Sequence, residues 1–165
     1  MPTTPDTLKA FTIKSDKIEN RLQTPVTIIN GSQSIEVPAL WDTGATCSCI
    51  SRDTATRLGL VATGKRRIAT PSGTTEVNTY LVSITLPNNV NIGYIPVCDS
   101  DIGRQGLGAL IGMDIISSGD FSVSNFNGKT VFTFRTPSHQ LTDYVQQIIA
   151  QNTMGKKHGR GNRKR

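Results

Sequence analysis

Short runs of β-branched and apolar residues, separated by turn residues, recur along most of this chain and constrain its fold more than any other feature. The runs are 25–30, 33–40, 77–86, 90–97, 121–126 and 129–135. Asn127-Gly128 separates the last two, and Asn-Gly is the strongest short-range signal for a β-hairpin. Asn30-Gly31-Ser32 separates the first two in a similar way. The pattern predicts an all-β fold, and 165 residues suffice for roughly one domain with a core of its own.

Two helices are expected beside the strands. Residues 51–58 are predicted to form one short helix, with Ser51 as its N-cap and Gly59 as its end. Residues 138–153 are predicted to form a C-terminal amphipathic helix capped by Ser138. Its apolar face is expected to pack on the body or on a partner subunit. The side chains that form this face are Leu141, Tyr144, Val145, Ile148 and Ile149.

The formal net charge of +6 is confined to the C-terminus. Residues 156–165 carry six of the 18 lysines and arginines and no acid, so residues 1–155 carry 12 basic and 12 acidic side chains. This composition predicts a disordered basic tail over residues 155–165. The tail is either a solvated terminus or a segment that contacts nucleic acid or an acidic partner.

The remaining composition argues against several classes of protein. No apolar stretch reaches the roughly 18 residues of a membrane span, and residues 1–20 lack the apolar segment of a secretory signal. A cytoplasmic protein without membrane contact is therefore expected, with residues 1–20 as a flexible lead-in. Three cysteines, Cys47, Cys49 and Cys98, match neither a disulfide framework nor the usual spacing of zinc ligands, so no metal is expected.

Residues 38–46 (PALWDTGAT) are the most informative stretch for chemistry. An apolar strand leads directly into Asp42, which would place this carboxylate in a largely desolvated position unless donors are supplied. Thr43 offers a hydroxyl, and Gly44 allows its N–H to approach the carboxylate. An Asx-type turn that closes a strand would show the same triplet. A second element, residues 110–116 (LIGMDII), has a glycine inside an apolar run, where another backbone could pass closely.

These motifs resemble the retroviral-type (retropepsin-like) aspartic proteases, in their cellular or bacterial branch more than the viral one. The resemblance covers about residues 20–136 and includes the Asp42 triplet, Leu58-Gly59-Leu60, the Thr/Ser/Gly-rich segment 68–75 and the element 110–114. It implies a closed acid-protease barrel with a flap hairpin over residues 21–136. Residues 137–154 would form the C-terminal helix.

The family resemblance also implies an endopeptidase that uses two carboxylates, one water and no cofactor. The chain contains one Asp-Thr-Gly and no second Asp-Thr-Gly or Asp-Ser-Gly, so a homodimer would have to bring two copies of Asp42 together. Its substrate would be an extended peptide or protein segment.

Individual roles follow from the resemblance. Asp42, Thr43 and Gly44 would be catalytic, and Leu110, Ile111 and Gly112 would support the loop from behind. Substrate would contact Ala45 and a flap at Thr70, Pro71, Ser72, Gly73 and Thr74.

Some positions depart from the viral pattern. Thr46 and Met113 occupy places where viral enzymes often carry an ion pair near the dimer contact, so residues 119–154 are the expected alternative contact. Lys65-Arg66-Arg67, next to the flap, could favour acidic substrates or be solvated charge. The alternative function is a non-catalytic peptide-binding or adaptor module whose basic tail contacts nucleic acid or an acidic partner.

Overall fold

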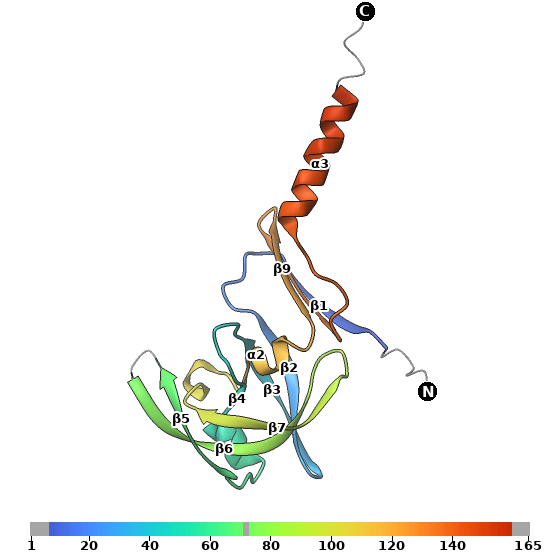
Figure 1. Cartoon of the computed structure of the whole chain (residues 1–165). Helices are drawn as coiled ribbons and strands as arrows, with labels where there is room; N and C mark the ends of the chain where they lie inside the picture. The colour runs from blue at the N-terminus through green and yellow to red at the C-terminus, as the bar shows by residue number, and fades with distance from the viewer. Residues whose placement is uncertain (1–6, 71–72, 160–165) are drawn as a thin grey trace, which may run out of the picture.

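The protein is described by a computed structural model over residues 7–70 and 73–159 (Figure 1). Pro71 and Ser72 of the expected flap and residues 160–165 of the expected tail lie outside the described residues. The elements of the larger sheet are β2 (Gln23–Asn30), β3 (Gln33–Trp41), β4 (Cys49–Ser51), β5 (Gly64–Thr70), β6 (Gly73–Thr85), β7 (Asn91–Ser100) and β8 (Ala109–Ile111).

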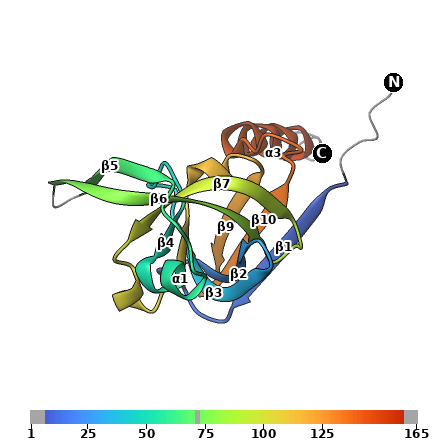
Figure 2. The same cartoon turned by 90° about the horizontal axis from the view of Figure 1, so that it is seen from below.

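The larger sheet closes into a barrel. Its strand order is β2-β3-β8-β4-β7-β6-β5, and an additional pairing between β2 and β6 joins the sheet to itself. Among the described strands β5 pairs with β6 alone, and the two strands form a long hairpin that extends from the barrel (Figure 2). The expected all-β barrel with a projecting flap hairpin is therefore confirmed.

Alternation of apolar and polar residues explains why these segments form a barrel. Val26 and Ile28 of β2 and Val82 and Ile84 of β6 are buried, whereas their neighbours along each strand are more exposed. Both Asn-Gly hairpins form as predicted. In the second, Asn127 and Gly128 take positive φ angles of 49° and 73°, as a two-residue type I′ turn requires.

A second, smaller sheet of three strands packs against the barrel and corrects one expectation. β1 (Lys9–Ser15) pairs antiparallel with β10 (Lys129–Thr136), which pairs with β9 (Asp120–Phe126). Residues 9–15 are thus a strand and not part of a loose lead-in. The reason is Phe11, whose ring lies 5.6 Å from that of Trp41 and 5.5 Å from that of Phe132, so this strand contributes to an aromatic cluster.

The short helix α1 (Arg52–Arg57) confirms its prediction. The Ser51 side chain accepts a hydrogen bond from the Thr54 N–H, and Gly59 follows the helix with a φ of +57°. Two further short segments were not anticipated, the 3-10 helix η1 (Gly103–Gln105) and the single-turn helix α2 (Met113–Ile116).

The C-terminal helix, α3 (Tyr144–Gly159), begins later than predicted. Ser138 does not cap it, because the Ser138 hydroxyl donates instead to Oδ1 of Asp120 at 2.5 Å. The helix start is capped by Asp143, whose Oδ1 accepts from the N–H groups of Val145 and Gln146. An aspartate at this position also interacts favourably with the positive end of the helix dipole.

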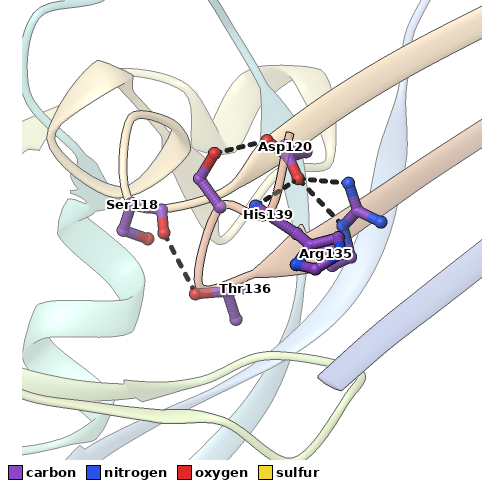
Figure 3. Close-up of polar contacts among 6 residues, drawn as sticks. Ser118, Asp120, Arg135, Thr136 and His139 are labelled. Atoms are coloured by element: carbon purple, nitrogen blue, oxygen red, sulfur yellow. Dashed lines mark hydrogen bonds and ion pairs between the residues drawn. The ribbon is translucent and has the colours of Figure 1, made fainter. Parts of the chain in front are cut away.

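Asp120 fastens the segment before α3 to the smaller sheet (Figure 3). Its Oδ2 accepts from the Arg135 guanidinium and from the His139 N–H, the latter at 2.9 Å. These bonds, with that of Ser138 first, hold the pKa of the Asp120 carboxyl well below its usual range. Beyond this anchor, α3 projects away from both sheets (Figure 1).

The apolar face of α3 is not covered by the body of this chain. Leu141, which precedes the helix, is 98% exposed, and Ile148 and Ile149 within it are 53% and 54% exposed. Of the two partners expected for this face, the body is therefore excluded. In the described part of the chain, no helix is long and apolar enough to cross a membrane.

Candidate active site

Asp42 lies directly after β3 and begins the Asp42 loop, here defined as residues 42–48. Its N–H donates to the Ile111 carbonyl at 2.9 Å, and its Oδ1 accepts from the Gly44 N–H at 2.9 Å. The approach of the Gly44 N–H therefore occurs as the sequence suggested. The expected strong desolvation does not, because Asp42 is only half-buried in the single chain. Its carboxylate is presented at the surface of the loop.

Gly112 supports the loop from behind through close backbone approach. A Cβ at this position would lie 2.7 Å from the Cys47 carbonyl carbon and 2.8 Å from its oxygen, so only glycine fits without moving the loop. The next residue, Met113, donates its N–H to the Ala45 carbonyl at 2.8 Å. Ile111 is fully buried, as expected, whereas Leu110 is half-buried and lines the adjoining cavity.

Ser48 and Asp114 hold the loop in place, and the sequence analysis assigned neither a role. The fully buried Ser48 hydroxyl donates to Oδ1 of Asp114 at 2.7 Å and accepts from the Gly112 N–H at 3.0 Å. The Ser48 N–H donates to Oδ2 of Asp114 at 2.9 Å. The available signal was a carboxylate two residues after Gly112 in an apolar run, because a charged side chain placed among apolar residues needs donors from elsewhere.

A cavity of about 370 Å³ lies between the Asp42 loop and the flap arm, which is the part of β5 formed by residues 66–69. Its lining residues are Gly44, Ala45, Thr46, Cys47, Cys49, Arg66, Arg67, Ile68, Ala69, Cys98, Ser100 and Leu110. The cavity thus brings together residues from the loop, from β5 and from the ends of β4 and β7. Its size fits one or two amino-acid side chains better than a large ligand.

The flap arm lines the cavity beside the Asp42 loop, whereas residues at the tip of the β5–β6 hairpin line another cavity. Thr70 pairs with Gly73 across the end of the β5–β6 hairpin. Gly73 and Thr74 line a different cavity, of about 320 Å³, together with residues that include Ser100 and Asp101. In this single chain the structure therefore places the flap arm, and not Gly73 or Thr74, against the cavity beside Asp42.

Residues 24–115 match the model of a family described as aspartyl protease. The chain belongs to this family. It is an aspartic endopeptidase, a hydrolase of peptide bonds. No curated protein sequence matches the chain.

Three solved structures are similar to this chain. A retropepsin-like aspartic protease from Rickettsia conorii superimposes with a TM-score of 0.53 at 12% identity, over 81% of this chain and 99% of that one, which supports the same fold. The EIAV protease, in complex with the inhibitor HBY-793, has a TM-score of 0.47 at 24% identity, over 60% and 88% of the two chains. The retroviral protease-like domain of Ddi1 from Leishmania major has a TM-score of 0.44 at 21% identity, over 75% and 100%.

The three thiols of this aspartyl protease meet at the cavity. Cys49 and Cys98 are paired in register across β4 and β7, and Cys47 lies in the Asp42 loop rather than on a strand with Cys49. Burial raises the pKa of the Cys49 thiol to about 12 and also raises the pKa of Cys98. Both thiols are therefore neutral near pH 7, and this wall of the cavity carries no negative charge.

Proposed function

We propose that this protease acts as a homodimer in which Asp42 from each subunit contacts one shared water. The observation that carries the proposal is the state of the Asp42 carboxylate. Within the described part of the chain, its one hydrogen bond comes from the Gly44 N–H. The carboxylate is thus accessible, and a second carboxylate must come from elsewhere.

The other aspartates of the described residues all have a partner within the chain, and none of them lines the cavity beside the Asp42 loop. Each accepts a hydrogen bond or forms an ion pair. These residues are Asp16, Asp53, Asp99, Asp101, Asp114, Asp120 and Asp143. A two-fold axis beside the loop would supply the missing group as a second Asp42.

Two facing carboxylates suit peptide hydrolysis because they cannot both ionise when they are so close. The ionised Asp42 would take a proton from the water as the water oxygen attacks the peptide carbonyl. The protonated Asp42 of the other subunit would donate its proton to the carbonyl oxygen and stabilise the tetrahedral intermediate. The two pKa values would belong to the pair.

The neighbouring residues support binding of an extended peptide. Thr43 is exposed, so its hydroxyl is available to the other subunit across the axis. Gly44 and Ala45 line the cavity that would hold a substrate side chain. The β5–β6 hairpin, including Thr70, Gly73 and Thr74, would close over the peptide as a flap.

We further propose that α3 contributes to the dimer contact. A second copy is already required by the single Asp42, and the apolar face of α3 is exposed in the single chain. Burial of Val145, Ile148 and Ile149 against the second subunit would remove this apolar surface from water. It would also provide a contact in place of the ion pair that Thr46 and Met113 cannot form.

The decisive experiment combines active and inactive subunits. Asp42→Asn is expected to lower peptide cleavage about 10³-fold or more, with the circular dichroism spectrum and the dimer mass unchanged. If equal amounts of wild-type and Asp42→Asn chains exchange subunits at random, about a quarter of the dimers retain both aspartates. Activity should then fall to about a quarter of that of an equal total amount of wild-type chain.

Two outcomes would contradict the proposal. Activity that falls to about one half in a mixture whose subunits have fully exchanged would show that each subunit acts alone. Cleavage of a broad peptide library by wild-type protein that is no faster than cleavage by Asp42→Asn would show that Asp42 is not catalytic. Asp53→Asn is the matched control, because Asp53 is exposed, pairs with Arg57 on α1 and does not line the cavity beside the loop.

A further inference from the structure

We propose that Arg66, with Arg67 beside it, makes the cavity next to the Asp42 loop a binding site for an acidic side chain, so that the enzyme prefers substrates with aspartate or glutamate near the cleaved bond. This inference names a substrate class for the proposed endopeptidase and rests on that function.

The position of β5 brings these arginines to the substrate side of the protein. Arg66 and Arg67 line the same cavity as Gly44 and Ala45. These two residues directly follow Asp42 and Thr43 in the chain. Arg66 also lies close enough to the Cys98 thiol, in the wall of this cavity, to interact with it. A peptide that reaches Asp42 would therefore place one of its side chains within reach of the Arg66 guanidinium.

The positive charges in the cavity lining have no acidic side chain beside them in that lining. Its lining includes two arginines and no aspartate or glutamate. The thiols of Cys49 and Cys98 stay neutral, because burial raises their pKa values. Among the described residues, no ion pair includes Arg66 or Arg67. A carboxylate on the substrate would complete this arrangement.

Lys65, which precedes Arg66 on β5, differs from the two arginines because it already has an anionic partner. Its Nζ lies 2.8 Å from Oε1 of Glu76, and it lines a different cavity with Glu76 and Tyr80. Its charge is thus already neutralised on the other side of the hairpin. A guanidinium can also bind a carboxylate through two parallel hydrogen bonds, which an ammonium cannot.

The size of the preference should be moderate. Arg66 and Arg67 are exposed in the single chain, and exposed ion pairs are weak because water screens them. A peptide bound under the closed flap would exclude part of this water. We expect glutamate to be favoured over glutamine by about tenfold in kcat/KM, the lower end for a charge-assisted pair.

The test uses peptides with one substitution each. Glutamate, glutamine or lysine is placed at each position around the scissile bond in turn, and kcat/KM is measured at about pH 6, where glutamate is ionised. Wild-type enzyme should prefer glutamate at one position. Arg66→Gln should remove this preference, Arg66→Lys should retain part of it, and Arg66→Glu should invert it in favour of lysine.

Two further measurements separate the outcomes. Lys65→Gln is the matched control and should leave the preference unchanged. Binding of the same fluorescent peptides to Asp42→Asn, measured by anisotropy, gives a readout that does not need turnover. Equal kcat/KM for glutamate and glutamine at every position would overturn the inference while leaving the protease function intact. Cleavage of no peptide by wild-type enzyme would instead contradict the proposed function. In that case, equal binding of all peptides to Asp42→Asn would still reject the acidic site.

Discussion

The Asp42 loop and α3 differ in how much of their environment one chain supplies. The loop is held from behind by Gly112, Ser48 and Asp114, whose hydrogen bonds all close within the chain. The apolar face of α3 is more than half exposed and is not covered by the described part of the same chain. The loop is thus structurally complete but lacks the second carboxylate of the proposed reaction, whereas the helix lacks a packing partner. One partner, a second copy of the chain, would satisfy both.

The largest effect is expected from Gly112→Ala. A Cβ at this position would contact backbone atoms of Cys47 at 2.7 and 2.8 Å, and backbone cannot move aside as a flexible side chain can. We expect a loss of about 3 kcal/mol in the free energy of unfolding, measured by urea denaturation, together with loss of peptide cleavage. Gly93→Ala is the control, since its Cβ would meet nothing closer than 3.8 Å. A Gly112→Ala protein of normal stability and activity would show that the loop is not held from behind.

Asp114→Asn should have the next largest effect. It removes one of the two carboxylate oxygens that accept from the N–H and hydroxyl of the buried Ser48. We expect a loss of about 2 kcal/mol by the same denaturation method, and a lower kcat because the position of Asp42 is less well defined. Ser117→Ala, which removes an exposed hydrogen bond from the end of α2, should change stability little. Equal effects of Asp114→Asn and Ser117→Ala would show that Asp114 does not hold the Asp42 loop in place.

Substitutions on α3 should affect association and not the fold of the single chain. Ile148→Gln with Ile149→Gln removes two exposed apolar side chains, so the subunit should unfold at nearly the same urea concentration when measured as a monomer. Because burial of one isoleucine contributes about 1.5–3 kcal/mol, the dimer Kd should rise roughly tenfold or more for each residue. Sedimentation equilibrium measures this change. Gln146→Ala with Gln147→Ala, on other faces of the helix, should leave the Kd unchanged, and an unchanged Kd for the isoleucine variant would remove α3 from the contact.

The smallest effect is expected from Asp120→Asn, which weakens the anchor between the smaller sheet and the segment before α3. The Ser138 hydroxyl, the His139 N–H and Arg135 lower the pKa of Asp120 in the folded state. Its contribution to stability is therefore complete above the unfolded pKa of about 3.9 and is lost as the pH falls further toward the folded pKa. The melting temperatures of wild type and Asp120→Asn should differ at neutral pH, and this difference should shrink progressively as the pH falls below about 4. Asp16→Asn, which removes an exposed ion pair with Lys129, is the control. A difference in melting temperature that grows as the pH falls would show that the ionised Asp120 carboxylate does not stabilise the fold.

Local features of the chain were sufficient to predict most strands and turns, and the resemblance then supplied the fold family. Asn127-Gly128 and the alternating runs predicted the hairpins because turn geometry and side-chain alternation act over a few residues. The predicted start of the C-terminal helix was wrong because a local pattern does not include interactions with residues distant in the sequence. Ser138 is a plausible cap in isolation, but Asp120, 18 residues earlier in the chain, holds its hydroxyl. Competition between partners that are distant in sequence cannot be seen from local pattern.

The sequence alone determined that one Asp-Thr-Gly follows an apolar strand, which is the basis for the prediction of a homodimer. It also determined that the excess positive charge is confined to residues 156–165. Only the tertiary structure decided that Ser48 and Asp114 meet behind the loop, that Arg66 shares a cavity with Ala45, and that α3 finds no cover on its own body. Each of these depends on which strands become neighbours when the barrel closes, and closure is set by the packing of the whole core rather than by any short segment.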